Sequence, residues 1–96
     1  MQERLLHEKV KKLFEAAGWI VRKVVYQGRN GCPDLMLVSP CGRIHLAELK
    51  QLKGRVSPIQ QREHERLAEN GCTVHIIRSV EQAKVLMARL LGEDLL

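Results

Sequence analysis

The segment from residue 34 to residue 50 limits the possible folds of this 96-residue chain more than any other feature. Two short runs rich in apolar residues flank a group of turn-forming residues centred on Cys41, a pattern that predicts an antiparallel β-hairpin. In a hairpin with that centre, residues equally distant from Cys41 face each other, so Asp34 lies opposite Glu48. Lys50, two residues further along, points to the same face as Glu48. The hairpin therefore gathers three charged groups at one end of one face.

Both faces of the predicted hairpin are apolar in the middle, which predicts a central place in a sheet that is covered on both sides. Two carboxylates that face each other there repel each other and resist the loss of water. A divalent cation held by oxygen ligands would compensate, and Mg²⁺ is commonly held by one or two carboxylates together with substrate phosphate. The alternative is an ion pair of Lys50 with Glu48 or Asp34 at a wet sheet edge. The face opposite these charges carries Leu35, Leu37, Ala47 and Leu49.

The rest of the chain reads as three helices and two further strands. Hydrophobic periodicity and turn residues predict a helix at 2–17, strands at 19–26, 34–39 and 43–50, a helix at about 58–70, a strand at 72–78 and a helix at about 80–91. Ser57 and Gln60 have the spacing of a capping box before the second helix. The order is αβββαβα, and we expect one domain over residues 1–96.

The first helix offers a third acidic residue to the same site. At 100° per residue, Glu3 falls within the apolar stripe that includes Leu6, Val10 and Phe14, whereas Glu8 falls on the opposite side. A glutamate on the buried face near a helix start either caps the N-terminus of the helix or binds a metal. A frayed first turn would instead leave it solvated.

The composition indicates an anionic partner, with nucleic acid as the first choice, because 16 Lys and Arg outnumber 11 Asp and Glu to give a charge of +5. The chain has one Trp, one Tyr and one Phe, so stacking of bases on exposed rings is not expected. Three cysteines without C-x-x-C spacing favour a reduced, cytoplasmic protein without zinc or a disulfide framework. We expect no membrane span, and without a G-x-x-x-x-G-K motif no nucleotide cofactor.

Several short motifs in a fixed order make the chain resemble a known nuclease family. Pro33-Asp34 followed by Glu48-Leu49-Lys50 matches the PD-(D/E)XK pattern of restriction-enzyme-like nucleases. Together with an early Glu3, with S-P-x-Q at 57–60 and with a late V-H-I-I-R-S, the chain resembles the VRR-NUC domain (virus-type replication–repair nuclease) over nearly its whole length. It is most similar to the small standalone, phage-type members.

The resemblance implies a restriction-endonuclease-like α/β core, with a mixed four-stranded sheet flanked by helices, and metal-dependent hydrolysis of DNA phosphodiesters. By this resemblance, Asp34, Glu48 and the carbonyl of Leu49 are metal ligands for Mg²⁺ or Mn²⁺, and Glu3 assists the metal. Lys50 stabilises charge on the phosphate or orients the attacking water, and Gln60 matches a family glutamine that the capping box explains equally well. The resemblance also implies a homodimer that cuts branched DNA, notably four-way (Holliday) junctions, in the cytoplasm of the host cell if a phage encodes it.

Basic residues beside the motifs are candidates for contact with DNA. Lys53 and Arg55 follow Lys50 in a basic run, and Arg29 precedes the first motif; each is expected either to contact phosphate or to serve as a solvated loop residue. Two rival functions remain at this point. One is a nuclease of the same fold acting on flap, nicked or single-stranded DNA, and the other is a basic DNA-binding module without catalysis.

Overall fold

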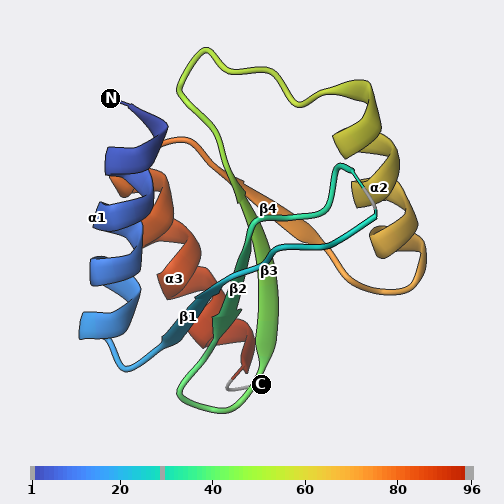
Figure 1. The fold of residues 1–96 in the computed structure, drawn as a ribbon. Helices are drawn as coiled ribbons and strands as arrows, with labels where there is room; N and C mark the ends of the chain where they lie inside the picture. Colours follow the sequence, from blue (N-terminus) through green and yellow to red (C-terminus); the bar gives the residue numbers. More distant parts are fainter. Residues whose placement is uncertain (1, 29, 95–96) are drawn as a thin grey trace.

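The predicted hairpin forms the centre of a four-stranded sheet in the computed structural model, which describes residues 2–28 and 30–94 (Figure 1). Strands β2 (Leu35–Val38) and β3 (Ile44–Leu49) pair antiparallel. Leu35 lies opposite Ala47 and Val38 lies opposite Ile44, which confirms the turn centred on Cys41. Gly42 closes this turn by donating its N–H to the carbonyl of Ser39 at 2.8 Å, with a φ of 86° that favours glycine.

The two outer strands make the sheet mixed. Strand β1 (Ile20–Lys23) pairs antiparallel with β2, and strand β4 (Val74–Ile77) pairs parallel with β3, so that the order is β1-β2-β3-β4. A parallel pair needs a crossover connection, which is here supplied by helix α2 (Pro58–Glu69). The element order αβββαβα and the mixed four-stranded sheet are therefore confirmed.

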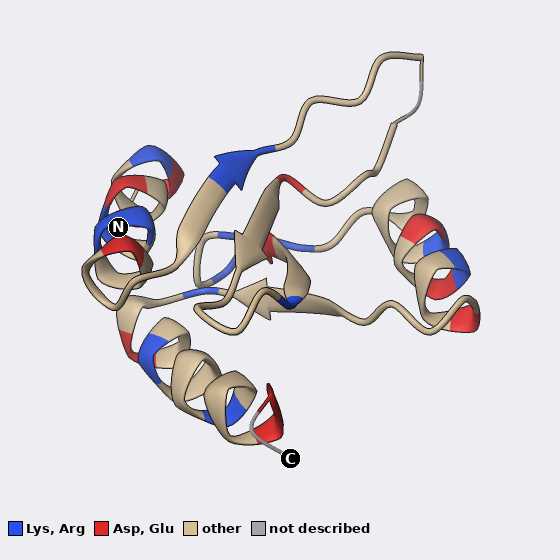
Figure 2. Ribbon diagram, turned by 90° about the horizontal axis from the view of Figure 1, so that it is seen from below, with Lys and Arg blue, Asp and Glu red and all other residues tan. Residues whose placement is uncertain are grey.

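The helices divide between the two faces of the sheet. Helices α1 (Glu3–Ala16) and α3 (Val80–Asp94) pack together on one face, while α2 lies on the other (Figures 1 and 2). Within the described residues, no helix combines the length and apolarity needed to cross a bilayer. The hydrophobic core lies between the sheet and the α1–α3 pair, and it consists of Leu6, Val10, Phe14, Trp19, Val21, Leu35, Leu37, Ala47, Leu49, Ile77, Ala83, Leu86 and Leu90.

The structure corrects the first strand. The run 19–26 pairs only from Ile20 to Lys23, and one more backbone hydrogen bond follows, from Val24 N–H to the carbonyl of Asp34 at 2.8 Å. The chain then leaves the sheet, and Val25 and Tyr26 are exposed. Figure 2 shows this long connection between β1 and β2 extending well away from the sheet.

Two further differences concern coverage and length. The hairpin is central, but the face that carries the charged residues is only partly covered, since α2 lies towards β4 and Ile44 is 62% exposed. Helix α3 continues past residue 91 to Asp94. The carboxylate of Asp94 lies 3.3 Å from His45 Nε2 and 3.8 Å from Arg43 Nε, contacts that hold the last turn against the hairpin.

Candidate active site

Asp34 is held at the start of β2 by several independent contacts. Its carbonyl accepts the N–H of Val24 at 2.8 Å, and its Oδ1 accepts the N–H of Leu49 on β3 at 3.3 Å. The preceding loop reaches α2, where a Cβ added to Gly31 would lie 2.8 Å from the carbonyl oxygen of Ile59. Only glycine fits this close approach at a φ of 86°. Sheet and helix thus fix the carboxylate from two sides.

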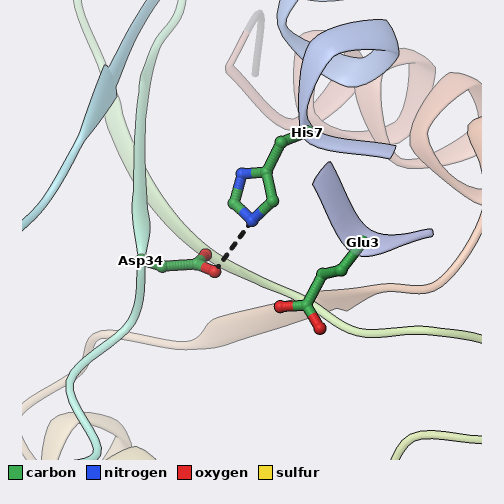
Figure 3. A group of neighbouring side chains, drawn as sticks. All are labelled: Glu3, His7 and Asp34. Carbon is green, nitrogen blue, oxygen red and sulfur yellow. Dashed lines mark ion pairs between the residues drawn. The ribbon is translucent and has the colours of Figure 1, made fainter. Parts of the chain in front are cut away.

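Helix α1 brings two more donor atoms to this carboxylate. The Nε2 of His7 lies 3.3 Å from Asp34 Oδ2, and Figure 3 shows the side chain of Glu3, one helical turn earlier, directed towards the same place. One donor atom from each of Glu3, His7 and Asp34 lies within 4.8 Å of the others. This spacing allows all three atoms to contact one small cation or a shared water.

Glu48 lies deeper and meets helix α2. Its side chain is 5% exposed, and its Oε1 lies 3.9 Å from His64 Nε2. That distance is too long for a hydrogen bond. Among the described residues, Glu48 Oε1 and His64 Nε2 are both buried without a hydrogen-bond partner. Buried polar atoms without a partner are uncommon, and a bound cation or water molecule would supply the missing contact.

Burial dominates the electrostatics of the two carboxylates. Loss of water, together with repulsion from Asp34, raises the pKa of Glu48 from 4.5 to about 7, although the charge of Lys50 opposes the shift. Burial also raises the pKa of Asp34, against the attraction of His7 and the hydrogen bond from Leu49. Burial likewise lowers the pKa of His64. Without a cation the cluster therefore resists carrying its full negative charge.

The residues present fit a divalent cation. Carboxylate oxygens are the ligands that Mg²⁺ and Mn²⁺ prefer, and imidazole is acceptable to Mn²⁺ and later transition metals. The unpartnered Glu48 Oε1 and the carboxylates with raised pKa values are the features that a bound positive charge would satisfy.

Lys50 and Leu49 continue from Glu48 along the end of β3. The N–H of Lys50 donates to the carbonyl of Ile77 on β4 at 3.0 Å, which fixes the backbone next to the carboxylates. The side chain of Lys50 is partly buried, and its charge acts on both Glu48 and His64. Leu49 is fully buried, and its backbone N–H is used by Asp34.

The remaining sequence candidates lie further from the carboxylates or have other partners. Gln60 completes the capping box of α2, because its side-chain oxygen accepts the N–H of Ser57 at 3.0 Å while its own N–H donates to Ser57 Oγ at 3.2 Å. Lys53 and Arg55 are exposed on the connection between β3 and α2. Arg29 lies outside the described residues.

Sequence reasoning missed His7. His7 follows Glu3 by four residues on one helix, so a signal existed, since residues at that spacing share a face. The proximity of His64 to Glu48 depends on how α2 docks against the sheet, and no local spacing reveals that. His45 lies at the other end of the hairpin with Asp94, away from the carboxylate cluster.

Similarity to known proteins extends over most of the chain. The model of the VRR-NUC domain family matches residues 2–81. A solved structure described as a VRR_NUC domain superposes with a TM-score of 0.82 and is 38% identical, covering 90% of this chain and 94% of the other. The candidate nuclease p44 of Acyrthosiphon pisum secondary endosymbiont phage 1 is 35% identical over 86 residues, which are 90% of this chain and 88% of that protein.

Proposed function

Because the chain belongs to the VRR-NUC family of nuclease domains, we propose that it is a metal-dependent, structure-selective DNA endonuclease that resolves four-way junctions as a homodimer. The observation that carries the proposal is the meeting of Asp34 and Glu48 with Glu3 and Lys50 at one end of the sheet. The three carboxylates of Glu3, Asp34 and Glu48 oppose one another's ionisation there, and Lys50 offsets this repulsion only in part, because the pKa of Glu48 is still raised.

In the proposed mechanism, Asp34, Glu48 and the carbonyl of Leu49 hold the cation, and Glu3 assists directly or through water. A bound divalent cation would lower the pKa of a water molecule and stabilise negative charge on the phosphate. Lys50 donates to a phosphate oxygen or orients the attacking water, beside the charge that develops. We also propose Gln60 as a site residue. It would act by fixing the backbone at the start of α2 through its capping box.

The surroundings support binding of a nucleic-acid backbone. A cavity of about 420 Å³ lies beside Glu3 and His7, and its other charged lining residues are Arg4, Glu8, Lys11 and Lys23, so that bases outnumber acids among them. Lys53 and Arg55 lie on the connection that leaves β3, and we propose that they contact phosphate, as we do for Arg29. Helix α2 alternates basic and acidic residues in Figure 2, so it is not a uniformly basic DNA-binding surface.

The preference for a branched substrate rests on size and symmetry. A single 96-residue chain has little surface with which to recognise a junction, whereas a two-fold dimer matches a two-fold substrate. We propose that the protein acts in the cytoplasm of the cell that contains it, a reducing compartment in keeping with three cysteines, Cys32, Cys41 and Cys72, that form no disulfide within the described residues.

The test compares the wild type with Asp34→Asn and Lys50→Ala on four-way junction, flap, nicked, linear duplex and single-stranded DNA, with Mg²⁺ or Mn²⁺. We expect the wild type to cut the junction fastest, Asp34→Asn to fall to background, and Lys50→Ala to lose about 100-fold in rate. Lys84→Ala, which removes an exposed lysine from α3, is the matched control and should cut normally.

Each other outcome identifies a rival. Fastest cleavage of flap, nicked or single-stranded DNA would keep the nuclease but reject the junction. Binding without cleavage by the wild type would identify a DNA-binding module. Equal cleavage by Asp34→Asn would remove that carboxylate from the chemistry, and sedimentation of a monomer on the junction would reject the dimer.

A further inference from the structure

Arg78 lies just after β4 and reaches across to the connection that carries the basic run. Its Nη1 lies 2.9 Å from the carbonyl oxygen of Gln51 and 3.4 Å from that of Leu52, and it also donates to the carbonyl of Gly54. One nitrogen with two hydrogens therefore faces three acceptors from a single turn. No acceptor here is a carboxylate, so this contact leaves the positive charge of Arg78 without a neutralising partner.

The turn itself is tight and leads directly away from the carboxylate cluster. Gly54 donates its N–H to the carbonyl of Gln51 at 2.9 Å, which closes a four-residue turn. Gln51 follows Lys50, whose N–H is bonded to the carbonyl of Ile77. The connection is thus fixed to β4 at its first residue and to Arg78, one residue after β4, at its turn.

The backbone of Arg78 is held in place by hydrogen bonds. Its backbone N–H donates to Gln82 Oε1 at 2.7 Å, and Gln82 in turn donates its N–H to Ser79 Oγ at 3.1 Å. The Ser79 side chain thus caps the start of α3, and Gln82 reaches back to the backbone of Arg78, one residue before that cap. Because the backbone is fixed, the guanidinium loses less freedom when it binds the three carbonyls.

The residues that the turn presents are Lys53, within it, and Arg55, directly after it, and both are exposed. We propose that Arg78 is a positioning residue, which holds the turn Gln51–Gly54 so that Lys53 and Arg55 meet the phosphates next to the bond that is cut. The inference rests on the proposed nuclease function for its DNA partner. The ordering of the turn by Arg78 is independent of DNA and can be tested alone.

The first test uses the free protein and limited digestion with trypsin, which cuts after Lys53 and Arg55. Arg78→Ala should speed cleavage at these two bonds by about ten-fold or more, since hydrogen bonds to a charged group no longer close the turn. Arg89→Ala, which removes an exposed arginine from α3, is the control and should leave the rate unchanged. Unchanged cleavage in a folded Arg78→Ala variant would overturn the proposal.

Arg78→Met keeps the proposal testable if the alanine variant does not fold. Methionine retains much of the apolar stem of arginine but has no N–H to donate to the three carbonyls, so cleavage by trypsin should still accelerate. A wild-type rate of cleavage in a folded Arg78→Met variant would overturn the proposed contact.

The second test measures binding of a four-way junction by fluorescence anisotropy, in an Asp34→Asn background and without Mg²⁺. The double change Lys53→Ala, Arg55→Ala removes two phosphate contacts from each protomer of the proposed dimer, so it should reduce the slope of log affinity against log salt by about 4, and Arg78→Ala should weaken binding similarly. Adding Arg78→Ala to the double change should then have little further effect. If the losses of affinity from Arg78→Ala and from the double change add in full, the proposal is overturned, because Arg78 would then affect DNA binding independently of Lys53 and Arg55. If the Asp34→Asn protein with Lys53, Arg55 and Arg78 intact does not bind DNA, the proposed function fails while the digestion result still decides whether Arg78 orders the turn.

Discussion

Replacing Glu48 by glutamine removes a negative charge from a place where burial opposes that charge. The side chain is 5% exposed, its Oε1 has no hydrogen-bond partner among the described residues, and its pKa is raised from 4.5 to about 7. Glutamine has nearly the same shape and carries no charge at any pH. The substitution should therefore stabilise the metal-free protein at alkaline pH while it abolishes cleavage.

The size of the effect follows from the two pKa values. Below about pH 4.5 the carboxyl is protonated in both the folded and the unfolded chain, so its ionisation costs the fold nothing. As the pH rises towards about 7, the unfolded chain ionises first and stability falls. The full loss is about 3 kcal/mol, of which about 2.5 kcal/mol develops between pH 5 and pH 8.

Urea denaturation in EDTA, followed by circular dichroism at pH 5 and pH 8, measures this loss. Between the two pH values, the free energy of unfolding of Glu48→Gln should rise relative to that of the wild type by about 2.5 kcal/mol, a shift in the urea midpoint of about 1–2 M. Glu65→Gln, at an exposed position on α2, is the control and should show no such change.

Adding Mg²⁺ should reverse the stability advantage of Glu48→Gln over the wild type. At pH 8 the cation should stabilise the wild type more than Glu48→Gln, because the variant has lost a ligand charge. If the two proteins keep the same stability difference at pH 5 and pH 8 without metal, burial does not oppose ionisation of Glu48, and our electrostatic account of the site is wrong.

Three further substitutions test other parts of the structure. Gly31→Ala should cost about 1–3 kcal/mol more than Gly28→Ala in chemical denaturation, since both have positive φ but only Gly31 approaches the carbonyl of Ile59; equal costs would refute the close contact. Ser57→Ala should lower stability by about 1 kcal/mol through loss of the α2 cap, measured by thermal unfolding, and an unchanged midpoint would contradict the capping box. His7→Ala should weaken Mn²⁺ binding about ten-fold or more by calorimetry, and equal affinity would remove this side chain from the site.

The hairpin was predictable because its signals are local. A turn centred on Cys41 and alternation on either side determine which residues face each other, and the observed register agrees with that prediction. The first strand was predicted too long for a related reason. Val25 and Tyr26 are residues typical of strands, yet they have no partner strand once the chain passes Val24, and they are exposed.

Only those parts of the candidate site that depend on the hairpin register or on the helical periodicity were predictable from the sequence. The opposition of Asp34 and Glu48, and the direction of Glu3, follow from periods of two and 3.6 residues. The places of His64 and Arg78 depend on the docking of α2 and on the parallel pairing of β4, which are contacts between residues distant in sequence. One sequence read by itself carries no local signal for them.

The hydrogen bond from Val24 N–H to the carbonyl of Asp34 gives the connection between β1 and β2 a closed base. Whatever happens at its tip, near the turn at Gln27 and Gly28, the two ends remain tied together beside the sheet. Because longer loops add little entropic cost once the ends are joined, residues can be inserted at this tip without moving the Asp34 carboxylate. The fold thus offers evolution, or a protein engineer, a place to change the surroundings of the candidate site while its carboxylates keep their geometry.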